Sequence, residues 1–533
     1  MRGMVVAPQP LAVEAGVEAL RRGGNAFDAA VTGAFVQMVV DPQMCGVAGF
    51  GVANVRTSGG EQKIIDFNGT SGSRVTPGMW RDVLINQDWT GYGYHLKGAV
   101  NDVGYQSIMT PGTVAGMAEV LSRFGSISWA SALQPAVTVA ENGFLISPEL
   151  WRTWNVPAPL GRVAMKDRIA ASPGSRALYI KGSGETLRPG ERFVNPDYGI
   201  VLRRLADVGP ADFYEGDLAA RMAADFEQNG GYVTAEDLAG YRVRVTDPIV
   251  TDYRGFTVAT NPPSGGGICV AEILNIIGHE SIAALGLNSA PYIDLVGHAM
   301  KAAFHDWYTY VADPEFFDVP VDWLMSPQRA HEWYTRIKRG ERFAVPLYSE
   351  PPTTTNITVV DSDGNCAVIT HSLGSSSGVV TPGLGFTYNN IMNAANPVPG
   401  EPNSIAPGKN RITGMCPTVV LRGNDPVLAL GAPGGTRIIT GVLQVILNVL
   451  DHGLSPVEAV SAPRFDCQSD VLDCEARIPS WVKAELGDRG FDINPNPAAY
   501  GNFALVQAVS RDSLSGVLAG GADPRGGGAA MST

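Results

Sequence analysis

The sequence lacks the features that would connect it to nucleic acid or to a membrane. Its 533 residues include 39 Lys and Arg against 52 Asp and Glu, a formal net charge of −13. Because phosphate binding needs clustered basic side chains and no such cluster occurs, we expect no nucleic-acid partner. Apolar stretches are too short to span a bilayer, and the first ten residues lack an apolar signal core. We therefore expect no membrane partner and a cytoplasmic location, with a periplasmic or secreted location as the alternative if a leader has been removed.

Cysteine is scarce, and the few cysteines are scattered along the chain. The six form no CxxC pair and have no histidine at ligand spacing. This pattern is typical of buried free thiols and argues against a disulfide framework or a metal site. We expect neither a metal nor another cofactor. The cysteines are Cys45, Cys269, Cys366, Cys416, Cys467 and Cys474.

The overall composition indicates a globular chain with many turns. Hydrophobic residues make up 45% and charged residues 17%, with 63 glycines and 37 prolines, which favours a sheet-containing enzyme over a helical bundle. Apolar spacing predicts helices over residues 10–22, 29–40 and 436–450. Alternating strands on both sides of Asp363-Gly364-Asn365 predict a β-hairpin. Strands and helices in this order predict a layered α+β fold.

A glycine-rich run at residues 45–51, "CGVAGFG", could be mistaken for a dinucleotide fingerprint. It follows a predicted helix, whereas the fingerprint follows a strand. We therefore interpret these glycines as positions of tight backbone packing.

Three consecutive threonines, Thr353, Thr354 and Thr355, stand between two prolines and the first strand of the hairpin. A solvated loop would explain them. A threonine hydroxyl also becomes a useful nucleophile when its own free α-amino group is the base, which requires the chain to be cut directly before it.

Groups that could assist such a nucleophile occur elsewhere in the chain. Ser372 lies on the return strand of the hairpin, and Gly434 and Gly435 open the predicted helix, where unpaired N–H groups favour a developing negative oxygen. Each also has a plain structural interpretation, as a surface hydroxyl or a helix-entry turn. From spacing alone the chemistry remains one hypothesis among several.

Many ordered segments resemble one known family. "TTNITVVDSDGN", "GVVTPGLGFTYNN", "RITGMCPTVVL", "GAPGGTRIITGVLQVILNVLDHGLSPVEAVSAPRF" and "ADPR" resemble the small subunit of the γ-glutamyltransferase family. "VEAGVEALRRGGNAFDAAV", "DFNGT", "TPGTVAGM", "TAEDLAGYRVRV" and "NPPSGGG" resemble its large subunit. The resemblance implies an α+β fold, the four-layer αββα sandwich of N-terminal nucleophile hydrolases. It also implies one precursor that is cut into two packed subunits.

The resemblance assigns catalytic roles to four residues. Thr354 is the expected nucleophile, freed by cleavage between Thr353 and Thr354 into residues 1–353 and 354–533. Ser372 takes the position of the hydroxyl that assists it, and Gly434 and Gly435 match the oxyanion pair. The two fragments are expected to form a heterodimer, and a dimer of such heterodimers is a further alternative.

The substrate positions depart from the family pattern. Asn68 stands where the family has the arginine that binds the α-carboxylate, and Ile391 and Ala394 stand where acidic and amide residues bind the α-amino group. Gly374 replaces an asparagine, and Thr413 and Gly414 replace paired serines. The candidate substrate-binding residues are Asn68, Thr355, Gly374, Asn390, Ile391, Thr413 and Gly414.

These departures shape the expected function. Each missing charged interaction is worth on the order of 1.5–3 kcal/mol, so a γ-glutamyl group should bind far more weakly than in the family at large. We expect an autoprocessed threonine hydrolase that acts on a small-molecule amide of non-glutamyl type. The resemblance also leaves oxamate-like amides, β-lactam side chains and an activated carbon–carbon bond open as substrates. One alternative is a γ-glutamyltransferase or glutathione hydrolase in which Arg411, Arg437 or Arg74 replaces the missing arginine, and another is an inactive scaffold of the same fold.

Overall fold

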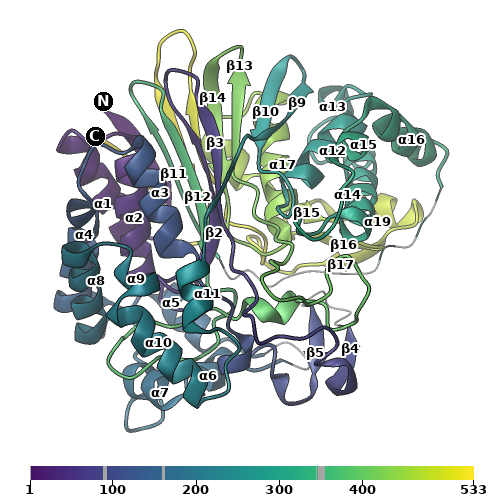
Figure 1. The fold of residues 1–533 in the computed structure, drawn as a ribbon. Helices are drawn as coiled ribbons and strands as arrows, with labels where there is room; N and C mark the ends of the chain where they lie inside the picture. Colours follow the sequence, from purple (N-terminus) through teal and green to yellow (C-terminus); the bar gives the residue numbers. More distant parts are fainter. Residues whose placement is uncertain (1, 88–92, 159–161, 342, 344, 346–353) are drawn as a thin grey trace.

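Two stacked β-sheets form the centre of the molecule, and a layer of helices covers each outer face (Figure 1). The computed structural model describes residues 2–87, 93–158, 162–341, 343, 345 and 354–533. The predicted α+β fold with αββα layers is confirmed.

The first sheet has seven strands, and its centre comes from two distant parts of the chain. The hairpin of β11 and β12 lies between β1 and β2, and all the pairings of this sheet are antiparallel. In spatial order the strands are β20 (Ala529–Ser532), β1 (Gly3–Ala7), β11 (Thr355–Asp361), β12 (Cys366–Ser372), β2 (Phe50–Arg56), β3 (Gln62–Phe67) and β8 (Arg244–Thr246).

The second sheet has six strands and packs its inner face on the first. Apolar side chains such as Val368, Val419 and Val509 fill the space between the two sheets. Its strands are also antiparallel. In spatial order they are β19 (Leu518–Ala522), β18 (Gln507–Arg511), β14 (Asp425–Gly431), β13 (Thr418–Arg422), β10 (Phe256–Thr260) and β9 (Ile249–Tyr253).

Two helical layers, each with its own apolar core, cover the sheets. Helix α2 is buried along its whole length between its helical neighbours and the first sheet, which explains why its sequence is apolar on all sides. The first layer contains α1 (Pro10–Arg21), α2 (Ala26–Val40), α3 (Thr113–Phe124), α4 (Trp129–Asn142) and α8 (Pro196–Val208). The second contains α12 (Gly267–Ile277), α14 (Ala290–Tyr310), α16 (Pro327–Lys338), α17 (Arg437–Leu450) and α19 (Ser480–Asp488).

Shorter elements complete the chain at the ends and edges of these layers. The helices are α5 (Pro148–Trp154), α6 (Met165–Arg168), α7 (Pro173–Tyr179), α9 (Asp212–Glu215), α10 (Asp217–Gln228), α11 (Ala235–Gly240), α13 (Ile282–Leu285), α15 (Val321–Leu324) and α18 (Pro456–Ser461). The 3₁₀ turns are η1 (Arg81–Val83), η2 (Lys97–Ala99), η3 (Tyr105–Ser107) and η4 (Ile391–Ala394). The strands are β4 (Leu84–Gln87), β5 (Tyr94–Leu96), β6 (Phe144–Leu145), β7 (Arg192–Phe193), β15 (Phe465–Asp466), β16 (Val471–Cys474) and β17 (Asp492–Pro495).

The predicted hairpin is confirmed, and its turn is attached to the first helical layer. Asp361 accepts hydrogen bonds from the N–H groups of Asp363 and Asn365, and Gly364 adopts the left-handed φ of +91° that the turn requires. The other Asp361 oxygen accepts from the Ala26 N–H at 3.0 Å, at the start of α2. The hairpin therefore has a fixed position against the helix beneath it.

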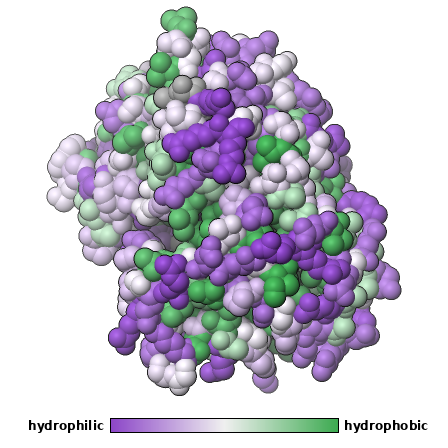
Figure 2. Space-filling model, turned by 90° about the vertical axis from the view of Figure 1, so that its left-hand side faces the viewer, coloured by the Kyte–Doolittle hydropathy of each residue, from purple (hydrophilic) through white to green (hydrophobic). Residues whose placement is uncertain are grey.

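The solvent-facing side of the first helical layer is mostly hydrophilic, with hydrophobic side chains in separate patches (Figure 2). All six cysteines are buried as free thiols, as the sequence predicted. No described helix is both long and apolar enough to cross a membrane. In the same part of the chain, no group of three or more His, Cys, Asp or Glu side chains could hold a metal ion.

Candidate active site

Thr354 lies at the head of the central hairpin, directly before β11. Register pairs Thr355 with His371, so the next pair outward is Thr354 and Ser372. The Thr354 hydroxyl donates a hydrogen bond to Ser372 Oγ at 3.3 Å, and Ser372 Oγ also accepts from the Gly374 N–H at 2.8 Å. The structure thus brings together the two hydroxyls that the sequence singled out. Thr353, on the other side of the predicted cut, lies outside the described residues.

The glycine-rich run after α2 packs against the end of β12. A Cβ atom on Gly49 would lie 2.3 Å from the carbonyl oxygen of Ser372, and one on Gly51 would lie 2.4 Å from that of Thr370. Neither position tolerates a side chain. The interpretation of this run as tight backbone packing is confirmed, and the packing supports the strand end that carries Ser372.

A narrow cavity lies between Thr354 and the segment that precedes β13. Its volume is about 10 Å³, room for a single water molecule. Its described lining includes one charged side chain, Arg411, and no Asp, Glu, His or Lys. The lining residues are Phe50, Thr354, Ser372, Gly374, Asn393, Ala394, Arg411, Thr413, Met415 and Ile438.

The histidine that precedes Ser372 does not face Thr354. His371 precedes Ser372 on β12, so its ring lies on the opposite face of the strand, where its Nε2 is 3.0 Å from Oε1 of Gln37. Burial lowers the pKa of His371 to about 3, so the ring is neutral near pH 7. His371 is therefore not a base for the Thr354 hydroxyl.

Thr355 belongs to the same buried polar network on that opposite face. Its hydroxyl donates to Gln9 Oε1 at 3.0 Å and accepts from Gln37 Nε2 at 2.9 Å. Gln9 in turn donates from Nε2 to the Asp41 carboxylate at 2.8 Å. The sequence placed Thr355 among the substrate-binding candidates, but the structure turns its side chain away from the cavity.

Thr354 also lines a second, wider cavity of about 440 Å³, between the first helical layer and the end of the sheets. Pro433 and Leu505 contribute to its wall, together with Asp41 at the end of α2. Burial raises the pKa of Asp41 to about 7. Thr354 therefore lines both a narrow cavity and a roomier one.

The two predicted oxyanion glycines form the turn that leads into α17. Gly434 has a φ of +148° and Gly435 a φ of +61°, both in the region that favours glycine. Among the described residues, neither glycine N–H donates a backbone hydrogen bond. Pro433 lines the wide cavity and Ile438 the narrow one, so the turn lies at the junction that Thr354 also occupies.

A buried charge cluster supports this turn from behind. The Leu505 N–H donates to the Pro433 carbonyl at 3.0 Å, and the Val506 N–H donates to Asp523 at 3.0 Å. Asp523 pairs with Arg464 at 2.7 Å and with Arg525 at 3.0 Å, all with buried side chains. The "ADPR" segment near the C-terminus therefore fixes the segment before β18, against which the glycine turn packs.

The remaining substrate-binding candidates divide into two groups. Gly374 and Thr413 line the narrow cavity. Gly414 lies behind it, where a Cβ atom would approach the Gly435 carbonyl oxygen to 2.4 Å, so its small size allows close packing against the oxyanion turn.

Asn68, Asn390 and Ile391 do not line either cavity that contains Thr354. Asn68 donates from Nδ2 to the Arg411 carbonyl at 3.0 Å, and Asn390 donates from Nδ2 to Asp102 at 2.9 Å. The Ile391 side chain packs over Gly69, where a Cβ atom would lie 2.3 Å from Ile391 Cδ1. These three residues support the walls of the site from behind.

The three arginines that could replace the missing family arginine lie in different places. Arg411 lines the narrow cavity, with its guanidinium carbon 5.4 Å from the centre of the Phe50 ring. Arg437 pairs with Asp473 at 2.7 Å, and Arg74 pairs with Glu227 at 3.2 Å. Only Arg411 of the three lines the described wall of the narrow cavity.

Sequence reasoning missed four residues of the wall: Phe50, Asn393, Met415 and Ile438. Asn393 and Met415 lie within or next to quoted motifs, but nothing in their spacing indicated which way they point. Phe50 begins β2, more than 300 positions from Thr354, and only the pairing of β2 with β12 brings the two together.

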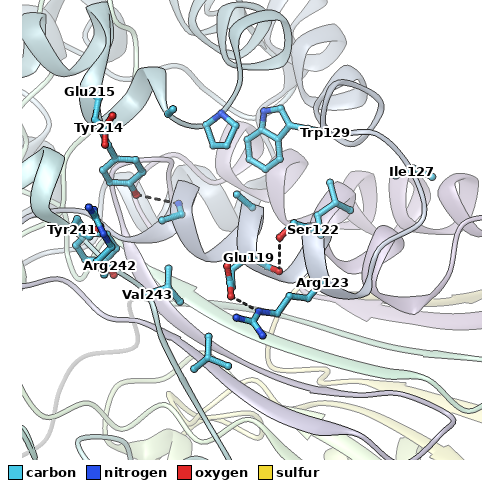
Figure 3. A pocket seen from close by; sticks show the side chains of 16 residues that line it. Glu119, Ser122, Arg123, Ile127, Trp129, Tyr214, Glu215, Tyr241, Arg242 and Val243 are labelled. Carbon is cyan, nitrogen blue, oxygen red and sulfur yellow. Dashed lines mark hydrogen bonds and ion pairs between the residues drawn. The ribbon is translucent and has the colours of Figure 1, made fainter.

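A larger cavity of about 860 Å³ lies elsewhere, beside α3 and α9, and contains none of the predicted catalytic residues. Figure 3 shows that its polar side chains bond to groups within the chain: Arg123 pairs with Glu119, and the Tyr214 hydroxyl accepts from the Ala115 N–H at 3.1 Å. The Trp129 ring nitrogen donates to the Leu205 carbonyl at 2.8 Å. The large volume of this cavity therefore does not make it the candidate active site.

An αββα sandwich with a threonine at the head of its central hairpin defines the class of N-terminal nucleophile hydrolases. The chain belongs to the gamma-glutamyltranspeptidase family, whose sequence profile matches residues 12–533. It is 35% identical to the acylase ACY 1 proenzyme of Pseudomonas sp. (strain V22), over 98% of this chain and 92% of that protein.

Two further comparisons agree with this assignment. The glutathione hydrolase proenzyme of Escherichia coli (strain K12) is 31% identical, over 98% of this chain and 90% of that protein. The crystal structure of a cephalosporin acylase from Bacillus halodurans superimposes with a TM-score of 0.89 at 30% identity, covering 100% of this chain and 96% of the other. Relatives of this chain thus include both acylases and glutathione hydrolases.

Proposed function

We propose that the chain is a self-cleaving threonine hydrolase that cuts the amide bond of a small, non-glutamyl substrate. Cleavage between Thr353 and Thr354 would give residues 1–353 and 354–533 and free the α-amino group of Thr354. This amine then takes the proton of the Thr354 hydroxyl, directly or through a water. The Thr354 oxygen attacks the acyl carbon while the Gly434 and Gly435 N–H groups bind the oxyanion. The amide C–N bond then breaks as the leaving amine takes the proton from the Thr354 ammonium. Water attacks the resulting Thr354 ester and releases the acid and the free hydroxyl.

The observation that carries this proposal is the composition of the narrow cavity. Thr354 and Ser372 hydroxyls lie 3.3 Å apart, yet the described lining of that cavity holds no Asp, Glu, His or Lys to act as a base. A free amine on Thr354 itself supplies the missing base. The relatives named as proenzymes support a cut chain.

The sheet topology supports a stable pair of fragments. Strands β11 and β12, from the second fragment, pair with β1 on one side and β2 on the other, both from the first. Each fragment alone would expose unpaired strand edges in the middle of the sheet. The proposed product is therefore a heterodimer of the two fragments.

A non-glutamyl acyl group follows from the charges near the nucleophile. A γ-glutamyl group carries an ammonium that needs an anion, and the described lining of the narrow cavity offers none. Glutathione hydrolase activity is the second candidate, because relatives with that name match nearly the whole chain. The first candidate is favoured because the described lining lacks that anion, and because the acylase ACY 1 proenzyme is 35% identical to the chain against 31% for the glutathione hydrolase proenzyme.

The cut is tested on a denaturing gel with sequencing of the new amino terminus. We expect two bands, with Thr354 as the first residue of the smaller one, and a single uncut band for Thr354→Ala. Thr353→Ala and Thr355→Ala serve as matched controls that keep the cut. A cut that persists in Thr354→Ala would show that another residue is the nucleophile.

The substrate class is tested with nitroanilides. Cut protein should release nitroaniline from simple acyl anilides faster than from the γ-glutamyl anilide. Faster release from the γ-glutamyl compound would overturn the non-glutamyl assignment and favour the second candidate.

A further inference from the structure

We propose that Gln37 and Gln9, both in the first fragment, are positioning residues for the nucleophile. They hold Thr355 in place, and Thr355 in turn keeps Thr354 opposite Ser372. We call this pair of side chains the glutamine clamp. The inference rests on the self-cleaving hydrolase proposed above and adds the means by which its first fragment positions the nucleophile of its second.

The proposed cut makes Thr354 the first residue of its chain. Terminal residues are poorly ordered unless they are tied down. Thr354 would then be joined to the protein covalently only through Thr355, while its hydroxyl donates to Ser372 at 3.3 Å. A displacement of about 1 Å in a catalytic group can lower a rate by about 100-fold. The position of Thr355 therefore determines how well the nucleophile is aligned.

Gln37 connects both strands of the hairpin at the end that carries Thr354. It lies in α2 and is buried. Its Nε2 donates to the Thr355 hydroxyl at 2.9 Å and to the Asn356 carbonyl at 3.0 Å, at the start of β11. Its Oε1 lies 3.0 Å from Nε2 of His371, which pairs with Thr355 from β12. Because a carbonyl oxygen only accepts, His371 donates from Nε2, and one side chain links the two strands.

Gln9 completes the clamp from the start of α1. Its Oε1 accepts from the Thr355 hydroxyl at 3.0 Å and from Gln37 Nε2 at 2.6 Å. Its Nε2 donates to the Asp41 carboxylate at 2.8 Å. Since the carboxylate accepts and the Gln9 oxygen faces two donors, only one orientation of this amide satisfies all three bonds. A fully satisfied buried network of this kind holds its members in one arrangement.

The contacts of the clamp are concentrated beside the two reacting hydroxyls. They fall on Thr355 and His371, which directly adjoin Thr354 and Ser372 in the sequence. Neither glutamine belongs to the described lining of the narrow cavity. The clamp should therefore affect the alignment of the nucleophile and leave the binding of the acyl group unchanged.

The main test replaces Gln37 by leucine, which keeps much of the volume and removes the amide hydrogen bonds. Cut protein is assayed with the best acyl anilide. We expect kcat to fall by about 10- to 100-fold while KM changes by less than about threefold, because the nucleophile is misplaced and the cavity wall is not. A kcat within about threefold of wild type would overturn the inference.

Gln444→Leu is the matched control. Gln444 is also buried, about two turns after the start of α17, and its Nε2 donates to the Thr440 and Phe465 carbonyls at 2.8 Å. The same substitution there should lower the melting temperature and leave kcat within about threefold. If Gln444→Leu lost as much kcat as Gln37→Leu, the effect would be general destabilisation and the positioning role would be wrong.

Two variants of Thr355 test the clamp from its other side, including the case in which Gln37→Leu does not fold. Thr355→Val keeps the shape and removes both hydroxyl bonds, whereas Thr355→Ser keeps the hydroxyl. We expect kcat to fall by about tenfold or more in the first and to stay within about threefold in the second. Equal kcat values in the two variants would contradict the clamp. Both should still be cut, because cleavage is a single event that reaches completion even when it is slowed.

Crystal structures separate this inference from the proposed function. In wild-type protein Thr354 should occupy one position in contact with Ser372, and in Gln37→Leu or Thr355→Val it should be displaced or spread over several positions. An unchanged Thr354 in these variants would overturn the clamp alone. Absence of the cut or of turnover in wild-type protein would overturn the proposed function, and the position of Thr354 would then decide the clamp by itself.

Discussion

Replacing Gly434 by alanine tests the oxyanion turn most directly. At a φ of +148° an alanine is strained, and its Cβ atom would lie 2.8 Å from both Cα and Cβ of Ala504. Ala504 cannot retreat easily, because its carbonyl accepts a hydrogen bond from the buried Arg464. The turn itself must therefore move, and the Gly434 N–H moves away from the acyl oxygen.

The expected loss of activity follows from the contribution that one oxyanion donor makes to kcat. Removing one such donor lowers kcat by about 10²- to 10³-fold, and the strained backbone costs on the order of 1–3 kcal/mol of stability. The assay is turnover of the best acyl anilide by cut protein, with a urea denaturation curve for stability. We expect kcat to fall while KM changes by less than about threefold, since the donor acts mainly in the transition state.

Gly209→Ala is the matched control. Gly209 follows α8 with a φ of +101°, and a Cβ atom there would meet nothing within 4 Å. This variant carries a comparable backbone strain far from the site, so stability should fall and kcat should not. If Gly434→Ala lost only as much activity as Gly209→Ala, the assignment of the turn as the oxyanion site would be wrong.

Three further changes test the surroundings of the nucleophile. Ser372→Ala removes the acceptor of the Thr354 hydroxyl, so self-cleavage followed on a gel should slow by about tenfold or more, and Ser372→Thr should keep it. Burial raises the pKa of Asp41 from 3.8 to about 7, so between these pH values the folded protein binds a proton that the unfolded chain has lost. The free energy of unfolding therefore falls as pH rises from about 4 through 7. Asp41→Asn should reduce the difference between the melting temperatures measured at pH 5 and pH 8. Arg525→Met leaves Glu475 and Asp523 buried with fewer partners and should lower the free energy of unfolding by about 3–5 kcal/mol, measured in urea, whereas a change below about 1 kcal/mol would contradict the supporting role of the cluster.

Local features of the site could be predicted because short-range sequence determines them. The Asp363-Gly364-Asn365 turn sets the hairpin register, and the register places Thr354 opposite Ser372. Gly434 and Gly435 predict a turn at the start of a helix. The helix begins at Arg437, one residue after its predicted start at Thr436. The helix predicted over residues 29–40 instead begins at Ala26, because Asn25 and Asp28 form a capping box that extends it.

The walls of the site could not be predicted in the same way. The family resemblance predicts that Asn68 faces the substrate, as the family arginine does. Its shorter side chain instead donates a hydrogen bond to the Arg411 carbonyl. Ile391 was expected in the cavity, yet the absence of a side chain on Gly69 gives it an apolar place to pack. The direction of each side chain depends on which neighbouring groups lie within bonding or packing distance in the folded chain. The sequence alone does not give those distances.

The residues that hold Thr354 and the residues that form the cavity wall come from different parts of the fold. Thr354, Ser372 and the glycine turn are held by hairpin register and by the cluster around Asp523, and the residues of that cluster do not belong to the described lining of the narrow cavity. The wall there comes from separate segments, with Phe50 on β2, Asn393 in η4 and Arg411 on the segment before β13. Replacing a wall residue therefore alters which acyl group binds while the attacking atoms stay in place. The present chain is consistent with such replacement, because Thr354, Ser372 and the glycine turn are present while Asn68 bonds to the Arg411 carbonyl and Arg411 lines the cavity.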